Sequence, residues 1–454
     1  MIPVYYDEGE EVWRKADSSN KRKDYKWYDY DSKMWANSVT VTSSSRATYQ
    51  NAGLGTEIDM NDILTMQVWI PRYKYKVWNY NSDGTKTSEP QEIEIVFEEG
   101  TNSTGDITCT DNIQGSSGNG TSETCRLTST NAICTDDTCN NKYYTHPAFT
   151  FGSEELEGFW IGKFEVSSDI ECTATTNSSV GEGCNLTTIN PLVRPNVESW
   201  RSAQISIYAS NIMKMNDEGN IYGFSTNVDT HLIKNMEWGA MAYFSHSKYG
   251  TCENGVCSEI YVNNCNQFIT GIGANTVDAT SSSLSCSSLE NMYNGRYGML
   301  ASTTGNIYGI YDVSGGAWEY VMGNVVSSDG KTMISGVSTS QNSGYTGKLY
   351  NSGSYTNYTG MYDYPDTKYY DKYSFATGRS EKKKSKLGDD IKETRTSDTT
   401  SWYNDYGYTI YSGTPWYGRS GMHTYSNGNF GIFMTGGSSG YPSANLSSRI
   451  VIVN

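Results

Sequence analysis

The sequence predicts a strand- and loop-rich α+β protein with about two helices. Gly (45 residues), Ser, Thr and Asn are abundant and Pro is scarce (9 residues), which is typical of many short strands joined by turns. Aromatic residues make up 13% of the chain, with 37 Tyr and 11 Trp, so the core is expected to depend on large rings. Two segments with helical spacing of apolar residues lie inside this strand-like frame, which is the order of an α+β fold.

The first 60 residues are predicted to form a small β module that attaches or assembles the protein. The segments "VYYDEGEEVW" and "KWYDYDSKMW" each have the pattern of a strand, a polar turn and a second strand. Because 454 residues exceed one average domain, a second unit is expected at residues 61–454. It opens with the strand formers "ILTMQVWIPRYKYKVW", and the alternating "QEIEIVF" predicts a returning strand.

Residues 100–142 are predicted to form a Cys-rich surface insertion, and two helices are expected after it. A strand is predicted from Phe159 to Val166. The first helix is predicted in "PNVESWRSAQISIYASNIMKMN", with Asn196 as its cap. The second is predicted in "IKNMEWGAMAYFSHS" and is expected to end before Gly250. The chain then returns to short strands and closes with "RIVIVN" as a last strand.

Charge and hydropathy exclude two classes of partner. The net charge of −16 argues against nucleic acid, because phosphate binding needs a basic face. No run of about 18 apolar residues occurs, so no membrane insertion is expected. The start "MIPVYYDEGEEVW" has neither the basic nor the apolar region of a signal peptide.

The ten Cys residues lie in close pairs, each able to close a short loop. In "CENGVC", Asn254-Gly255 predicts a type I′ hairpin whose strand ends a disulfide would clamp. Zinc is the alternative, but structural zinc sites usually have spacings nearer C-x2-C. We therefore expect disulfides and an extracellular, cell-surface or virion-surface location, with the connectivity left open. The pairs are Cys109 and Cys125, Cys134 and Cys139, Cys172 and Cys184, Cys252 and Cys257, and Cys265 and Cys286.

Five motifs resemble, in order, those of the formylglycine-generating-enzyme (sulfatase-modifying-factor) family. They are "FWIGKFEVS", "HLIKNMEWGAMA", "NIYGIYDVSGGAWEYV", "GRSGMHTY" and "SSRIVIV". The resemblance implies a C-type-lectin-like fold of the formylglycine-generating-enzyme type. In the family's "GNVWEW" segment the Glu lies beside calcium. Trp318 and Glu319 match it, but Gly316 replaces the Asn, which removes an oxygen that a hard cation would use. Calcium at Glu319 is thus one expectation, and a structural role for both side chains is the other.

The resemblance also bears on catalysis. The oxidases of the family carry a copper-binding Cys pair after their "RGGSW"-like segment, since soft thiolates hold copper(I). The corresponding stretch here, residues 418–449, contains no Cys. We therefore expect no catalytic residues and no cofactor apart from the calcium considered above, and a non-catalytic protein.

Residues 402–454 are the expected ligand-binding region. Tyr, Ser, Gly and Asn dominate it, and these residues supply stiff contact area and adaptable hydrogen bonds. The chain also resembles the variable proteins of diversity-generating retroelements, found on phage tails and bacterial surfaces, which use this end of the fold for binding. By position, the implied ligand-binding residues are Trp416, Tyr417, Arg419, Met422, His423, Tyr425, Asn427, Asn429, Tyr441 and Asn445.

The expected function is therefore that of an adhesin or a phage tail receptor-binding protein with a protein or glycan receptor. A homo-oligomer, or attachment to a larger assembly through the N-terminal module, is also expected. Two alternatives stay open: a metal oxidase of the formylglycine-generating type, and a structural subunit of a fibre or virion.

Overall fold

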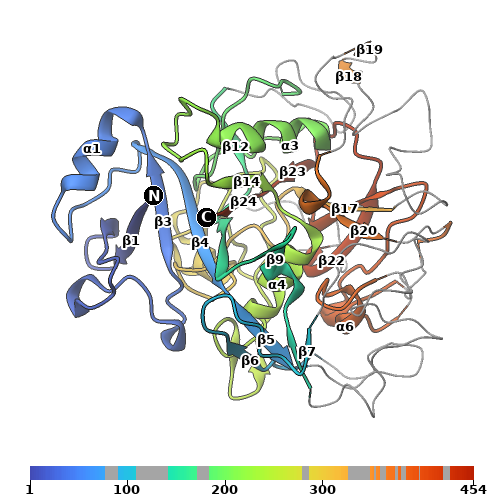
Figure 1. The fold of residues 1–454 in the computed structure, drawn as a ribbon, viewed down its shortest axis with the longest axis horizontal. Helices are drawn as coiled ribbons and strands as arrows, with labels where there is room; N and C mark the ends of the chain where they lie inside the picture. The colour runs from blue at the N-terminus through green and yellow to red at the C-terminus, as the bar shows by residue number, and fades with distance from the viewer. Residues whose placement is uncertain are drawn as a thin grey trace.

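The computed structural model is strand-rich and α+β, as the sequence predicts (Figure 1). Long loops connect short strands, and the helices lie between and beside the sheets. Further assignment to a C-type-lectin-like fold stays a prediction. The structure describes residues 1–76, 90–108, 142–170, 184–278, 286–325, 348–351, 354–357, 365–373, 377–379, 385–397, 399–422 and 430–454.

An antiparallel sheet of seven strands, in the order β14-β24-β11-β4-β3-β1-β2, forms one half of the molecule. Its C-terminal strand β24 is buried at every position, as expected for a short apolar run between two neighbours. Next to the edge strand β2, β1 alternates between buried and partly exposed residues. The bounds are β1 Ile2–Asp7, β2 Val12–Lys15, β3 Asn37–Val41, β4 Ile63–Pro71, β11 Gly158–Gly162, β14 Asp229–Leu232 and β24 Ile450–Val453.

A second sheet holds the C-terminal strands, in the order β20-β17-β21-β22, and β23 also pairs with β17. The strand β21 lies between β17 and β22 and is buried along its whole length. This sheet is drawn in orange and red in Figure 1. The bounds are β17 Trp318–Val325, β20 Asp371–Tyr373, β21 Trp416–Gly421, β22 Phe430–Ser438 and β23 Leu446–Ser448.

The remaining strands form small sheets, and they include two of the predicted hairpins. The strand β5 pairs with both β6 and β8, and β7 pairs with β8. At the tip of the β15–β16 hairpin, Asn254 and Gly255 both have positive φ, as a type I′ turn requires. The bounds are β5 Tyr73–Lys76, β6 Ile95–Phe97, β7 Ile107–Thr108, β8 Tyr143–Thr145, β9 Thr150–Phe151, β10 Glu154–Glu155, β12 Ser167–Ser168, β13 Pro191–Leu192, β15 Cys252–Glu253, β16 Val256–Cys257, β18 Lys348–Asn351 and β19 Ser354–Asn357.

Both predicted helices are present. The helix α4, Asn235–Ser245, is buried on every side, and its Gly239 packs against the backbone of Gly388 so closely that a Cβ would lie 1.9 Å from the carbonyl oxygen. The helix α3, Ile205–Met213, begins nine residues after Asn196, so the predicted cap is wrong. Asn196 has a φ of 58° and its N–H donates to the Thr270 carbonyl. The other helices are α1 Ser43–Asn51, α5 Arg296–Leu300 and α6 Ile391–Thr394.

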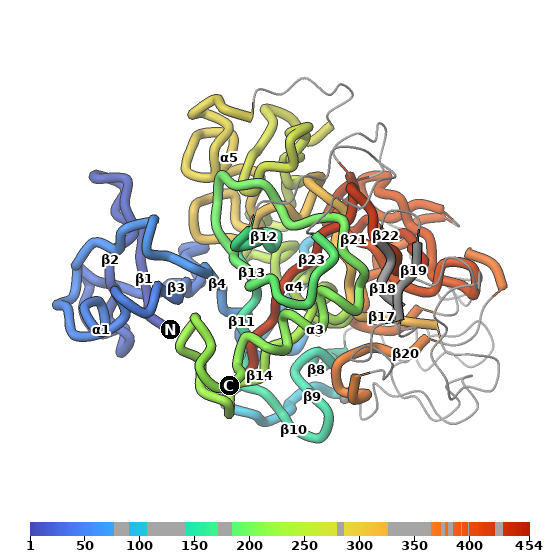
Figure 2. The backbone as a smooth tube through the Cα atoms, turned by 90° about the horizontal axis from the view of Figure 1, so that it is seen from above, coloured from blue at the N-terminus to red at the C-terminus, as the bar shows by residue number. Residues whose placement is uncertain are grey.

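Residues 1–60 are continuous with the rest of the fold. Strand β3 pairs with β4 over five residue pairs, and one apolar core includes side chains from both sides of residue 60. The predicted boundary near residue 60 therefore does not mark a separate body. In Figure 2 this blue segment lies at one end of the molecule and the orange and red C-terminal segments lie towards the other. Its role in attachment stays a prediction.

A buried lysine joins the N-terminal strands to the middle of the chain. The Lys163 ammonium donates to Asn37 Oδ1 at 2.8 Å, to the Ile307 carbonyl at 2.7 Å and to the Gly309 carbonyl at 2.8 Å. It also lies 5.2 Å from the centre of the Trp13 ring, within the range of a cation–π interaction. All three donors are used, so this buried charge has the hydrogen bonds it needs.

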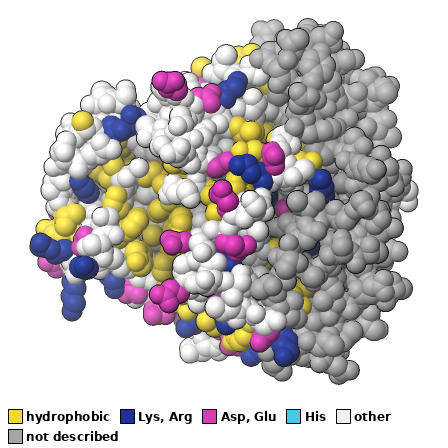
Figure 3. All heavy atoms as spheres, in the orientation of Figure 1, with side chains coloured by type: hydrophobic (Ala, Val, Ile, Leu, Met, Phe, Trp, Pro, Cys, Tyr) yellow, Lys and Arg dark blue, Asp and Glu magenta, His cyan; other side chains and the backbone are white. Residues whose placement is uncertain are grey.

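Part of the surface is apolar. Figure 3 shows hydrophobic side chains gathered over the region of β3 and β4, next to scattered acidic ones. Trp160 and Trp69 face each other across β11 and β4 with ring centres 5.1 Å apart, and Trp27 stacks on Trp160 at 6.1 Å. Within the described ranges, no helix has both the length and the apolar character needed to cross a membrane.

We predict that Lys163→Met lowers the free energy of unfolding by at least about 2 kcal/mol, because three buried acceptors lose their donor. Urea unfolding followed by Trp fluorescence measures the change. The control Lys26→Met removes only a surface pair with Asp29 and is expected to cost under about 1 kcal/mol. Equal effects of the two substitutions would contradict the structural role of Lys163.

Candidate functional site

The structure separates the ten predicted ligand-binding residues into three groups. Trp416, Tyr417 and Arg419 lie on β21 and are fully buried, and Met422 follows them at 6% exposure. Tyr441 is 49% exposed and Asn445 is half-buried. The other four, His423, Tyr425, Asn427 and Asn429, lie outside the described residues.

The expectation that the β21 side chains are exposed is wrong, because this strand is internal to its sheet. The Arg419 guanidinium donates to Asn235 Oδ1 on α4 and, at 2.8 Å, to Asp390 Oδ1. The Tyr417 ring packs edge-on against Tyr373 with ring centres 5.1 Å apart. A sequence rich in Tyr therefore builds the core here.

Glu319 is a structural residue. Both of its carboxylate oxygens accept hydrogen bonds from Arg449, with Nε donating to Oε2 at 2.9 Å, and neither side chain is exposed. Both oxygens are thus held by a guanidinium, which supports the structural role, and calcium at Glu319 stays a prediction. Trp318 is partly buried and packs over Gly418 and Gly436 of the neighbouring strands.

The rest of the "IYDVSGGAWEYV" segment is a turn built around Asp312. Its Oδ1 accepts hydrogen bonds from the Asn263 side chain and the Gly271 N–H, both at 2.8 Å. Asp312 has a φ of 61°, and Gly315 and Gly316 follow with positive φ. A Cβ on Gly316 would lie 2.5 Å from a carboxylate oxygen of Glu165, so the glycine makes room for that buried side chain.

A groove of about 640 Å³ opens elsewhere on the surface, beside the β15–β16 hairpin. The hairpin forms one wall, and Val256, the first residue of β16, is 73% exposed. The end of α5 supplies Leu300, and Lys33 reaches in from the N-terminal segment. The full lining is Lys33, Thr251, Glu253, Asn254, Val256, Ser258, Glu259, Tyr261, Leu300, Thr304 and Gly305.

Three cross-links fix the hairpin in place. The Cys252–Cys257 disulfide joins its two strands. Lys33 Nζ pairs with Glu253 Oε1 at 3.2 Å, and the Gly255 N–H donates to Glu92 Oε2 at 2.9 Å. This wall of the groove is therefore formed before any ligand arrives, which lowers the entropy cost of binding.

A small inner pocket adjoins the groove, and both are lined by Thr251, Ser258 and Glu259. Its volume is about 10 Å³, which is enough for one water molecule. His246 and Tyr403 line it and are hydrogen-bonded to each other, with Nε2 and the phenol oxygen 2.8 Å apart.

Two further side chains give the inner pocket its polarity. Asp405 Oδ2 accepts a hydrogen bond from the Phe433 N–H at 3.1 Å. The carboxylate lies against Gly431, where a Cβ would come within 2.0 Å of it. The Ser314 hydroxyl is buried and has no hydrogen-bond partner within the described part of the chain. The pocket is thus lined by two carboxyl groups, those of Glu259 and Asp405, and by the Ser314 hydroxyl.

Burial sets the protonation of these groups. Burial, together with the charge of Asp278, raises the pKa of Glu259 from 4.5 to about 7. Burial, reinforced by the charge of Glu259, raises the pKa of Asp405 well above its ordinary range. Burial lowers the pKa of His246 to about 4, so its ring is neutral at pH 7. Near neutral pH, Glu259 can both donate and accept hydrogen bonds.

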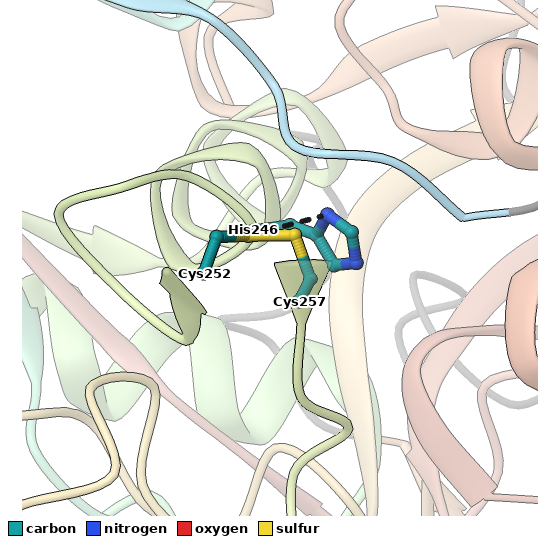
Figure 4. A group of neighbouring side chains, drawn as sticks. All are labelled: His246, Cys252 and Cys257. Carbon is teal, nitrogen blue, oxygen red and sulfur yellow. Dashed lines mark hydrogen bonds between the residues drawn. A yellow bond between two sulfur atoms is a disulfide. The ribbon is translucent and has the colours of Figure 1, made fainter. Parts of the chain in front are cut away.

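Two of the predicted disulfides are present, Cys252–Cys257 and Cys265–Cys286. Figure 4 shows the first of them beside the His246 ring. Cys184 is buried, and its predicted partner Cys172 lies outside the described residues. The pairs Cys109 with Cys125 and Cys134 with Cys139 also lie outside them.

The sequence did not indicate the groove or its inner pocket. Glu259, Tyr403 and Asp405 are brought together from segments more than 140 residues apart, and none of them lies in a known motif. The one local signal was "CENGVC", which predicted the hairpin that forms the wall.

We predict that Glu319→Ala lowers the free energy of unfolding by about 3–5 kcal/mol, because Arg449 is left buried without its partner. Denaturant unfolding measures this. The double substitution Glu319→Leu/Arg449→Met removes both charges and is expected to cost less than the single one. If calcium instead stabilised the wild type and not Glu319→Ala, the structural role would be wrong.

The raised pKa of Glu259 predicts a pH-dependent stability. Since the folded-state value of about 7 exceeds the ordinary 4.5, the contribution is full below about pH 4.5 and is lost as pH rises through about 7. The unfolding free energy of wild type minus that of Glu259→Gln should therefore fall over this interval, measured by urea unfolding at several pH values. The exposed Glu154→Gln is the control. A difference that is constant with pH would contradict this assignment.

Comparisons with known proteins do not identify the chain. No protein-family model matches the sequence, and no curated protein matches it significantly.

Proposed function

We propose that the protein is a non-catalytic ligand- or receptor-binding protein, displayed outside a cell or on a virion. The observation that carries this proposal is the groove beside the β15–β16 hairpin. It is open to solvent, about 640 Å³ in volume, and bounded by a wall with three cross-links. A pocket of this size accommodates a short segment of a larger ligand.

The lining of the groove suits a receptor with mixed chemistry. Val256 and Leu300 offer apolar contact, and Tyr261 offers a ring with a polar tip. Lys33 and the two glutamates offer charge and hydrogen bonds. A protein or a glycan receptor can use this combination, in which apolar contacts supply affinity and polar groups supply orientation.

An extracellular or surface location is supported by the disulfides. Both described bridges close short loops near the surface, and such bridges persist in oxidising compartments.

We further propose that the fold is C-type-lectin-like, of the formylglycine-generating-enzyme type. The support is that the motifs on which the resemblance rests meet in space. Arg449 of "SSRIVIV" pairs with Glu319 of the "GGAWEYV" segment and donates to the carbonyl of Gly162 in "FWIGKFEVS" at 2.8 Å.

The alternative of a structural subunit has one specific observation in its favour. The N-terminal segment exposes Met1, Tyr28 and Leu54 at 36–40% of their surface. Hydrophobic side chains also gather over β3 and β4 (Figure 3). Such a patch is suited to contact with another subunit or with a larger assembly. This segment is therefore the proposed attachment face, and it also supplies Lys33 to the groove.

The binding proposal is tested by screening purified, oxidised protein on glycan and surface-protein arrays. We predict that Val256→Arg weakens binding to the ligand found by at least tenfold, since it places a charge at the exposed wall of the groove. Leu186→Arg, which changes a 39% exposed leucine that does not line the groove, is the matched control and should bind normally.

Tyr441→Ala tests the other accessible candidate surface. Loss of binding in Tyr441→Ala but not in Val256→Arg would move the site to the C-terminal region and overturn the groove assignment. Absence of any ligand, together with self-association, would favour the structural subunit.

A further inference from the structure

His246 and the Cys252–Cys257 disulfide form a compact group of three residues of the types that bind metals. The imidazole nitrogens and the two sulfurs offer ligand atoms that all lie within 4.8 Å of one another. His246 Nδ1 lies 3.9 Å from Cys252 Sγ, and Figure 4 shows the ring beside the bridge. In the described part of the chain, no other group of His, Cys, Asp and Glu side chains meets this geometry.

The distance from the imidazole nitrogen to the Cys252 sulfur is close to that of a zinc site. A tetrahedral zinc ion at about 2.3 Å from sulfur and about 2.0 Å from nitrogen holds these two atoms about 3.5 Å apart. The observed 3.9 Å therefore needs an adjustment of a few tenths of an ångström, and the two sulfurs, once reduced, must move to about 3.8 Å from each other. The two cysteines are directly opposite each other on adjacent strands, so their sulfurs stay neighbours when the bond between them is absent.

A second contact orients the imidazole. The Tyr403 hydroxyl is hydrogen-bonded to Nε2 at 2.8 Å, which leaves Nδ1 on the side of the sulfurs. Ligating imidazoles commonly have such a partner on the nitrogen that does not bind the metal, because it fixes the ring and its tautomer. His246 is 2% exposed, so its ring has little freedom to turn away.

We propose that reduction of the Cys252–Cys257 disulfide creates a binding site for a thiophilic divalent cation of the Zn²⁺ class, with His246 and the two cysteines as ligands. A dithiol reductant supplies two electrons and two protons, the S–S bond breaks, and the dithiol becomes a cyclic disulfide. The cation then displaces both thiol protons and binds two thiolates and one neutral imidazole.

The two cysteines and His246 supply three ligands, and neither cysteine lines the inner pocket beside His246. A water molecule from the solvent would be the fourth ligand. Two Cys, one His and a water complete a four-coordinate site. The cation would also join the two strands of the hairpin, so the groove wall would stay closed in reducing surroundings. This inference does not depend on the proposed ligand binding.

Cobalt(II) is the probe for the site, because thiolate ligands give it strong charge-transfer absorption. The full-length protein is titrated anaerobically with and without a phosphine reductant, and Zn²⁺ is then added in competition with a chromogenic chelator. We expect one additional equivalent of Co²⁺ bound in the reduced wild type relative to Cys252→Ser/Cys257→Ser, and no such difference in the oxidised proteins.

Three variants decide the assignment. Cys265→Ser/Cys286→Ser removes the other described bridge and should retain the additional equivalent. His246→Gln should weaken Zn²⁺ binding and alter the cobalt spectrum. Tyr403→Phe should weaken binding by about 10–100-fold while leaving the stoichiometry unchanged. Circular dichroism confirms folding. Equal Co²⁺ binding by the reduced wild type and Cys252→Ser/Cys257→Ser would overturn the proposal.

Discussion

The buried ion pair between Arg449 and Glu319 connects the two main sheets. Arg449 lies between β23, which pairs in the second sheet, and β24, which pairs in the first. Its guanidinium holds Glu319 on β17 and donates to the carbonyls of Gly162 and Tyr311, at 2.8 and 2.9 Å. A buried charge is tolerated only when its hydrogen-bond donors are used. The partners of Arg449 therefore constrain the position of the chain between β23 and β24.

The tyrosines explain why composition alone did not show that the β21 side chains are buried. Many Tyr rings are buried here, and their hydroxyls donate to backbone carbonyls across the core. The Tyr73 hydroxyl donates to Ala240 at 2.7 Å, that of Tyr208 to Leu446 at 2.9 Å and that of Tyr320 to Tyr441 at 2.8 Å. A tyrosine can thus fill volume and also satisfy a carbonyl that an aliphatic side chain would leave unpaired. Frequent use of Tyr is thus typical of a binding surface and also of a core with few Leu and Ile.

Local patterns predicted the elements whose causes are local. The hairpins β1–β2 and β15–β16 follow from turn residues between strand formers, and α4 follows from its apolar spacing. The start of α3 was not predictable in this way. Residues before it donate backbone hydrogen bonds to distant segments, as Ser199 does to Phe268 and Trp200 to Val166. The groove and its inner pocket depend on similar long-range packing, because Lys33, Glu259 and Tyr403 come from separate parts of the sequence. The periodicity and the spacing of residues in the sequence do not indicate that such distant residues lie close together.

The hairpin beside the groove shows how a small element can be made rigid. A two-stranded hairpin is marginally stable in water by itself, and β15 and β16 have only two residues each. The disulfide joins the two strands to each other, and the Lys33–Glu253 pair and the Glu92 hydrogen bond to Gly255 connect the hairpin to the rest of the chain. The two polar links are exposed and individually weak, since solvent screens them. The covalent link is therefore the main source of rigidity. A cation bound by His246 and the two thiolates would preserve a cross-link at the same place, so the shape of the groove would remain coupled to the chemistry of these two sulfurs.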